Sequence, residues 1–137
     1  MSDTFSFSFG NGDSQTLSVK TRQLFQEMFP RAINVEWSKG ASCEEAIFYQ
    51  DDNECIALFN PENGLVEYRV NHNRLMLPLE IEQAAAVHGE IMNVITVHKH
   101  PMNDDIDHYE IIFRDAHLVR YTLLLRPDGS EVSITRL

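Results

Sequence analysis

The densest group of residues that could do chemistry lies between His98 and His108. His98 and His100 are two positions apart, so on a strand their imidazoles would share a face, and a hairpin would bring His108 near. Imidazoles grouped in this way are typical ligands of transition metals. The segment between them, however, is rich in proline, asparagine and aspartate, which are ordinary loop residues. We therefore expect a solvated loop, with no tightly bound metal and no cofactor.

Aromatic side chains on predicted strands form the second group of candidates. Trp37, Tyr49 and Tyr68 are the candidate binding residues, because aromatic side chains on an open sheet can anchor a partner. Tyrosine is also an ordinary strand residue, favoured wherever a side chain packs on a pleated surface. Trp37 has a further interpretation as a core residue held between the first helix and the sheet, and these alternatives stay open at this point.

The sequence contains no pattern that predicts a catalytic residue. Glu44 and Glu45 are adjacent, so on a strand they point to opposite faces and cannot form an acid–base dyad. Neither a glycine-rich phosphate loop nor a GxSxG nucleophile motif is present. An enzyme is therefore the least supported class of function.

Length and composition favour one globular domain covering residues 1–137, with 43% hydrophobic and 23% charged residues. The formal net charge of −10 would be repelled by nucleic acid and by an anionic membrane surface, so neither is an expected partner. No apolar run is long enough to cross a membrane. The first residues lack the features of a secretory signal, which predicts a cytoplasmic location, or a periplasmic or secreted one if a leader has been removed.

Two helices and a series of strands are predicted to carry these side chains. Apolar residues recur at helical spacing from Thr16 to Phe29, where Pro30 ends the helix. Pro78 fits the first position of a second helix, and Gly89 fits the position just after its end. Strict alternation predicts a strand over Thr4–Phe9. The other predicted strands are Asn34–Trp37, Glu44–Gln50, Glu54–Phe59, Leu65–Val70, Asn93–His98, His108–Arg114, His117–Arg126 and Glu131–Arg136.

The turn at Asp51-Asp52 sets the expected register of the first long hairpin. If Gln50 pairs with Asn53, Cys55 lies opposite Phe48 and Cys43 lies opposite Asn60. The two thiols are then too far apart for a disulfide, so we expect both to be reduced.

The order of elements repeats weakly along the chain, with a first repeat at about 14–71 and a second at about 75–137. Each repeat has a helix followed by four strands. The predicted fold class is therefore α+β, with one antiparallel sheet of about eight strands, two helices packed on one face, and an extra N-terminal strand.

The residues around the first helix carry a resemblance to a known family. Leu24-Phe25, Met28-Phe29-Pro30 and Asn34-Val35-Glu36-Trp37, followed by a hairpin and by Leu77-Pro78, resemble the PepSY-like domain, a group similar to the β-lactamase inhibitor protein. The resemblance covers roughly residue 16 to the C-terminus. It implies tandem helix-plus-sheet repeats and a concave sheet face that grips a partner, but it assigns no functional residue.

The function that these observations favour is an uncharacterised soluble module that binds or inhibits a protein partner through an open sheet face. The alternative is a small acidic cytoplasmic chaperone for a secreted protein, although that class usually ends in a helix, whereas this chain ends in the predicted strand Glu131–Arg136. We expect the phenylalanines of Thr4–Phe9 to dock on their own domain, which favours a monomer over a dimer.

Overall fold

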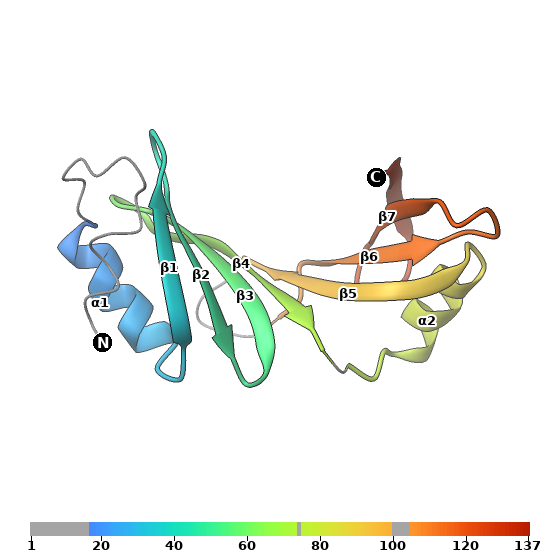
Figure 1. The fold of residues 1–137 in the computed structure, drawn as a ribbon, viewed down its shortest axis with the longest axis horizontal. Coiled ribbons are helices and arrows are strands. Elements are labelled where there is room, and N and C mark those ends of the chain that lie inside the picture. Colours follow the sequence, from blue (N-terminus) through green and yellow to red (C-terminus); the bar gives the residue numbers. More distant parts are fainter. Residues whose placement is uncertain (1–16, 74, 100–104) are drawn as a thin grey trace.

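The structure is a computed structural model, and it describes residues 17–73, 75–99 and 105–137. A helix precedes four strands, and a second helix precedes four more (Figure 1). The helices are α1 (Val19–Met28) and α2 (Leu79–Ala86). The strands are β1 (Ile33–Lys39), β2 (Glu44–Gln50), β3 (Asn53–Asn60), β4 (Gly64–His72), β5 (Glu90–His98), β6 (His108–Arg114), β7 (Arg120–Leu125) and β8 (Glu131–Arg136).

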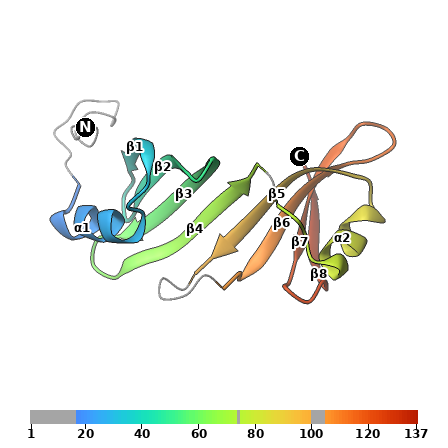
Figure 2. The ribbon, with the colours of Figure 1, turned by 90° about the horizontal axis from the view of Figure 1, so that it is seen from below.

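All eight strands form one open antiparallel sheet in which each strand pairs with the next along the chain. The sheet is strongly twisted, and its two ends rise on the same side, so that one face is hollowed (Figure 1). The two helices lie at opposite ends of the molecule (Figure 2). The α+β class and the sheet of eight antiparallel strands are confirmed, while the predicted strand Thr4–Phe9 lies outside the described residues.

Helix α1 begins where the sequence supplies a cap. The Ser18 hydroxyl accepts a hydrogen bond from the Thr21 backbone N–H at 3.0 Å, and the Ser18 N–H donates to the buried Glu44 carboxylate at 3.1 Å. The last turn closes at Phe29, because Pro30 offers no N–H for another. The cap thus ties the start of the helix to strand β2.

The first hydrophobic core lies between α1 and strands β1–β4 and is mainly aromatic. Phe25 contacts Trp37 and Phe48 edge to face, with ring centroids 5.1 and 5.0 Å apart. Ala46 and Ala57 are fully buried on neighbouring strands, and their small side chains leave room for these rings. We call this side of the sheet the covered face.

The second core lies on the same face and is mainly aliphatic. Ile81 and Ala85 of α2 pack on Ile111 and Leu123, and all four are fully buried. Cross-strand pairing carries the covered face from one core to the other through Tyr68–His98 and Thr96–Tyr109, since paired residues point to the same side.

The second helix is shorter than predicted. Pro78 occupies the cap position rather than the first helical position, and the helix ends at Ala86, before Gly89. A Cβ on Gly89 would lie 2.3 Å from the carbonyl oxygen of Arg114, so glycine is required by a close backbone approach and not by the end of a helix.

Strand bounds agree with prediction where turn chemistry is simple and differ where a side chain reshapes the turn. Strand β7 was expected from His117 but begins at Arg120. The Asp115 carboxylate accepts hydrogen bonds from the N–H groups of His117 and Val119, and Leu118 adopts a positive φ of 64°. These contacts hold the residues before Arg120 in a turn.

The predicted register of the β2–β3 hairpin is confirmed. Gln50 pairs with Asn53 and Phe48 pairs with Cys55, while Asp51 and Asp52 take the positive φ values that a tight hairpin turn requires. Cys43 and Cys55 are free thiols.

Candidate functional site

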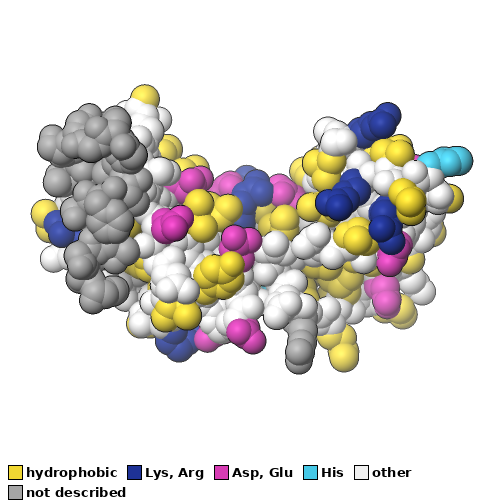
Figure 3. All heavy atoms as spheres, in the orientation of Figure 1, with side chains coloured by type: hydrophobic (Ala, Val, Ile, Leu, Met, Phe, Trp, Pro, Cys, Tyr) yellow, Lys and Arg dark blue, Asp and Glu magenta, His cyan; other side chains and the backbone are white. Residues whose placement is uncertain are grey.

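The face of the sheet opposite the helices is uncovered by any other element of the described chain, and we call it the open face. It forms the floor of the hollow between the raised ends (Figure 3). Alternation along the strands places half-buried apolar side chains on it, because their neighbours in sequence fill the cores. These apolar side chains are Ile47, Ile56, Leu58, Ile95, Ile112 and Leu124.

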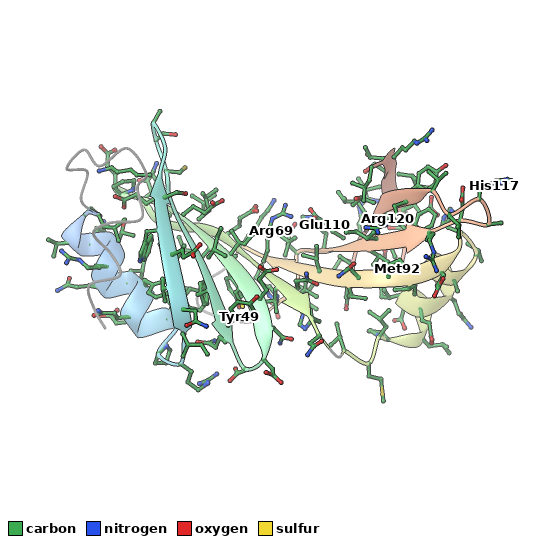
Figure 4. The ribbon with its side chains drawn as sticks, viewed as in Figure 1. Tyr49, Arg69, Met92, Glu110, His117 and Arg120 are labelled. Carbon is green, nitrogen blue, oxygen red and sulfur yellow. The ribbon has the colours of Figure 1, made fainter. Side chains whose placement is uncertain are left out.

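A pair of charged side chains occupies the centre of the open face. The Arg69 guanidinium on β4 donates to both oxygens of Glu110 on β6, at 2.6 and 2.9 Å, and its Nε donates to Glu67 at 3.0 Å. Figure 4 shows Arg69 and Glu110 side by side in the hollow. The contact crosses β5 and therefore joins the first four strands to the last four. Its two-pronged geometry fixes the plane of the guanidinium.

Burial and charge act in opposite directions on Arg69. Partial burial works to lower the pKa of Arg69, but the hydrogen bonds and charges of Glu110 and Glu67 outweigh it and raise the pKa. The Glu110 side chain is only 14% exposed, so loss of Arg69 would leave a poorly solvated carboxylate. The pair thus connects the two halves of the sheet and places charged groups at the centre of the open face.

The charge network continues from Glu110 toward the end of β5. His108 Nε2 lies 3.4 Å from Glu110, and His108 Nδ1 lies 2.8 Å from Asp107. The hydrogen bond from His108 lowers the pKa of Asp107; burial opposes this, and the charge of Lys99, 3.6 Å away, adds to the lowering. Arg69 and Lys99 thus each lie against acidic side chains, which offsets part of the negative charge at the centre of the face.

Tyr49 is the exposed aromatic residue of the open face, with 44% of its surface accessible. Figure 4 places it on the first half of the sheet. Tyr49 pairs with Glu54, and Arg69 pairs with Ile56 two residues further along β3, so both side chains lie on the same face. It borders a shallow polar pocket of about 270 Å³. The pocket is also lined by Asp52, Glu54, Asn71, His72, Asn73 and Asn93.

The three predicted binding residues are separated by the two faces. Trp37 is 1% exposed and packs against Phe25 in the first core, so the core interpretation is the one its burial supports. Tyr68 lies on the covered face, stacked on His98 with ring centroids 4.5 Å apart. Tyr49 alone of the three points into the open face, because it alternates with Phe48 along β2.

The histidines proposed as a cluster are also divided by the sheet. His108 pairs with Val97, so it shares the open face with that residue, whereas His98 lies on the covered face. His100 lies outside the described residues. Within residues 17–73, 75–99 and 105–137, no group of three or more histidine, cysteine or acidic side chains is arranged to hold a metal ion.

His98 instead belongs to a hydrogen-bonded chain on the covered face, between the two cores. His98 Nδ1 donates to the Asp105 carbonyl at 3.2 Å, and His98 Nε2 lies 2.8 Å from the Thr96 hydroxyl oxygen. The Thr96 oxygen then accepts from His72 Nε2 at 2.7 Å. Burial, together with the charge of His98, lowers the pKa of His72. The lowered pKa favours the neutral form of the His72 imidazole.

Sequence patterns missed Arg69 and Glu110, which are 41 residues apart in the chain. Glu67, Arg69 and Asn71 alternate along β4, so their polar side chains share one face of the strand. This alternation can be read from the sequence. The pairing of Arg69 with Glu110 cannot be read from the sequence, because it depends on the β4–β5 and β5–β6 registers.

Comparison with known proteins identifies the fold. No family model and no curated protein matches the chain. A DUF2874 family protein from Bacteroides uniformis has a similar structure, with a TM-score of 0.73, 19% identity, and coverage of 88% of this chain and 89% of that chain. A protein from Bacteroides eggerthii, whose description proposes a periplasmic location, has a TM-score of 0.74 at 18% identity. The match covers 89% of this chain and 90% of that chain.

A third similar structure bears on the resemblance found in the sequence. A BLIP-like protein from Bacteroides fragilis has a TM-score of 0.73 at 13% identity and covers 93% of this chain and 90% of that chain. No helix in the described part of the chain is long and apolar enough to span a membrane. The chain therefore has a fold similar to that of BLIP-like proteins, as the sequence resemblance implied, while the PepSY-like assignment finds no match.

Proposed function

We propose that this protein binds, and through binding inhibits, a protein partner on the open face of its sheet. The observation that carries the proposal is a sheet face that no other element of the described residues covers, with half-buried apolar side chains around the Arg69–Glu110 pair and an exposed Tyr49. Tyrosine and arginine dominate the energetic centres of protein interfaces, and apolar side chains around them exclude water.

The comparisons support this proposal at the level of the fold. A BLIP-like protein has a similar fold, and the sequence itself resembles a group similar to the β-lactamase inhibitor protein. The order helix then four strands occurs twice here, which supports the inferred duplication of residues 14–71 and 75–137 and the PepSY-like interpretation. The location proposed for the Bacteroides eggerthii protein favours a periplasmic or secreted site of action over the expected cytoplasmic one.

The two other functions have less support. No feature of the described residues favours a small acidic chaperone for a secreted protein over binding on the open face. We also propose that the protein is not an enzyme, because the acidic and basic side chains at the centre of the open face are engaged with one another. That arrangement leaves them poor candidates for proton transfer to a substrate.

Affinity capture from the native cell tests the proposal when it is done with matched variants. Tyr49→Ala removes an aromatic ring from the open face, and Val87→Ala removes an exposed apolar side chain beside α2, on the covered side. We expect the wild type and Val87→Ala to retain a shared protein, and Tyr49→Ala to retain at least tenfold less of it. Equal retention by Tyr49→Ala, with loss in Val87→Ala, would contradict the proposal. Equal thermal unfolding of the three proteins excludes misfolding as the cause.

A further inference from the structure

Acidic and basic side chains lie toward opposite ends of the open face, and this separation indicates the kind of partner that the face would bind. Strands β1–β4 place four carboxylates on it, those of Glu36, Glu45, Glu54 and Glu67. Arg69, the one basic side chain that the described residues of these strands place on this face, is already bound by Glu67 and Glu110. The first half of the face is therefore acidic (Figure 3).

The far end of the same face has the opposite charge. Arg114 on β6 pairs directly with Arg120 on β7, an arrangement in which like charges repel. Glu90 neutralises Arg114 at 2.7 Å. No carboxylate in the described part of the chain lies within ion-pair distance of Arg120, which is exposed and points into the hollow (Figure 4). An acidic group on a partner would relieve this repulsion.

The acidic half also contains the Tyr49 pocket. Asp52 and Glu54 line it and form no ion pair within the described residues, and the exposed ring of Tyr49 lies beside them. An aromatic ring next to unpaired carboxylates suits an ammonium or guanidinium group, which gains a cation–π contact and an ion pair together. The pocket is thus suited to the end of a lysine or arginine side chain.

We propose that the open face binds a protein segment with ordered charge, whose basic side chains meet the Tyr49 pocket and whose acidic side chains meet Arg114 and Arg120. This rests on the proposed function and adds the chemistry of the partner. A second copy of this chain would offer complementary charges if rotated, but its face is equally hollow, so two copies could not fill one another (Figure 3). A convex segment of a different protein fits both the charge and the shape.

Short peptides test the order of charge without knowledge of the partner. The probes are tri-lysine and tri-glutamate with blocked ends, added at low salt to the isotope-labelled full chain and followed by amide NMR signals. We expect tri-lysine to shift signals around Tyr49, Glu54 and Asn71, and tri-glutamate to shift signals around Arg114 and Arg120. The proposal would be overturned if tri-lysine shifted the signals of the helices and of the open face to the same extent, because such shifts would reflect net charge alone.

Matched variants separate a local effect from the overall charge. Glu36→Gln/Glu54→Gln removes two exposed carboxylates from the face, and Glu27→Gln/Glu82→Gln removes two from the helices. We expect the first pair to weaken tri-lysine binding about threefold and the second to leave it nearly unchanged. Arg120→Gln should remove the tri-glutamate shifts. Equal weakening by both pairs would overturn the proposal.

Two further outcomes distinguish this inference from the proposed function. In the first outcome, the captured protein is lost on Tyr49→Ala, but the peptides do not discriminate between the two ends of the face. The face then binds a partner, and the inference about the charge order of that partner is wrong. If light scattering finds a dimer that Arg120→Glu dissociates, a second copy occupies the face and the proposal of a different protein is overturned. Preferential binding of each peptide at its expected end supports the inference even if no protein is captured.

Discussion

The two faces of the sheet are built from alternate residues of the same strands, yet they differ in almost every physical respect. Phe48 on the covered face is fully buried against α1, while its neighbour Ile47 on the open face is only half-buried. The covered face holds both cores, and the open face holds the Arg69–Glu110 pair. Coverage by helices, and not strand composition alone, therefore separates the face that stabilises the fold from the face that stays open.

The largest expected contrast is between neighbouring residues of β2. Phe48→Ala should lower the free energy of unfolding by about 3–5 kcal/mol, because it leaves a cavity among the aromatic rings of the first core. Ile47→Ala should cost only about 1 kcal/mol, since half of the lost surface was already in contact with water. Urea unfolding followed by Trp37 fluorescence measures both. Equal losses would mean that the open face is part of the core.

A smaller effect is expected at the centre of the open face. Arg69→Leu should lower the free energy of unfolding by about 2 kcal/mol, because Glu110 is left without its partner. This value lies between those typical of exposed and of buried ion pairs. Arg69→Leu/Glu110→Leu should recover most of that loss. The matched control is Arg31→Leu, which breaks the exposed Arg31–Asp51 pair and should leave the urea midpoint unchanged. No recovery in the double variant would show that Arg69 acts through packing instead.

The sequence predicted the elements better than the site, and the reason lies in the range of the interactions. Pro30 and the turn at Asp51-Asp52 act locally, so they fixed the end of α1 and the β2–β3 register. The Arg69–Glu110 contact depends on three strands in correct register, which no local pattern specifies. Tyr49 on β2 and Tyr68 on β4 have the same residue type on the two strands that flank β3, and only their register relative to the helices separates an open position from a covered one.

The covered face should also make stability depend on pH. The pKa of His72 is lowered in the folded chain, by burial first and then by the charge of His98, so the unfolded chain binds protons more readily. The contribution of His72 to stability is therefore fully present above its ordinary pKa of 6.5. It is lost as the pH falls through the lower pKa of His72 in the folded chain. We expect His72→Asn to reduce the loss of stability on acidification in urea titrations at several pH values. The exposed His117→Asn serves as control, and an equal change in both would contradict this role for His72.

The smallest expected effect concerns the two thiols. Burial raises the pKa of Cys55 to about 11, and only 4% of the residue is exposed, so its thiolate is both rare and inaccessible. Cys43 is partly exposed. Alkylation at neutral pH should therefore modify Cys43 first, and Cys55 only when the chain unfolds, as mass spectrometry of digested protein would report. Rapid modification of Cys55 in native protein would show that the covered face opens.

If the open face binds a protein partner, side chains on that face must lie in direct contact with it. Site-specific photo-crosslinking tests this contact most directly, with p-benzoylphenylalanine placed in the native cell at position 49 on the open face or at position 87 beside α2. Tyr49 and Val87 are both exposed, so each photoreactive group is accommodated without entering a core. We expect a discrete crosslinked product from position 49 and none from position 87. A product from position 87 alone would contradict this expectation and place the partner on the helix side of the sheet.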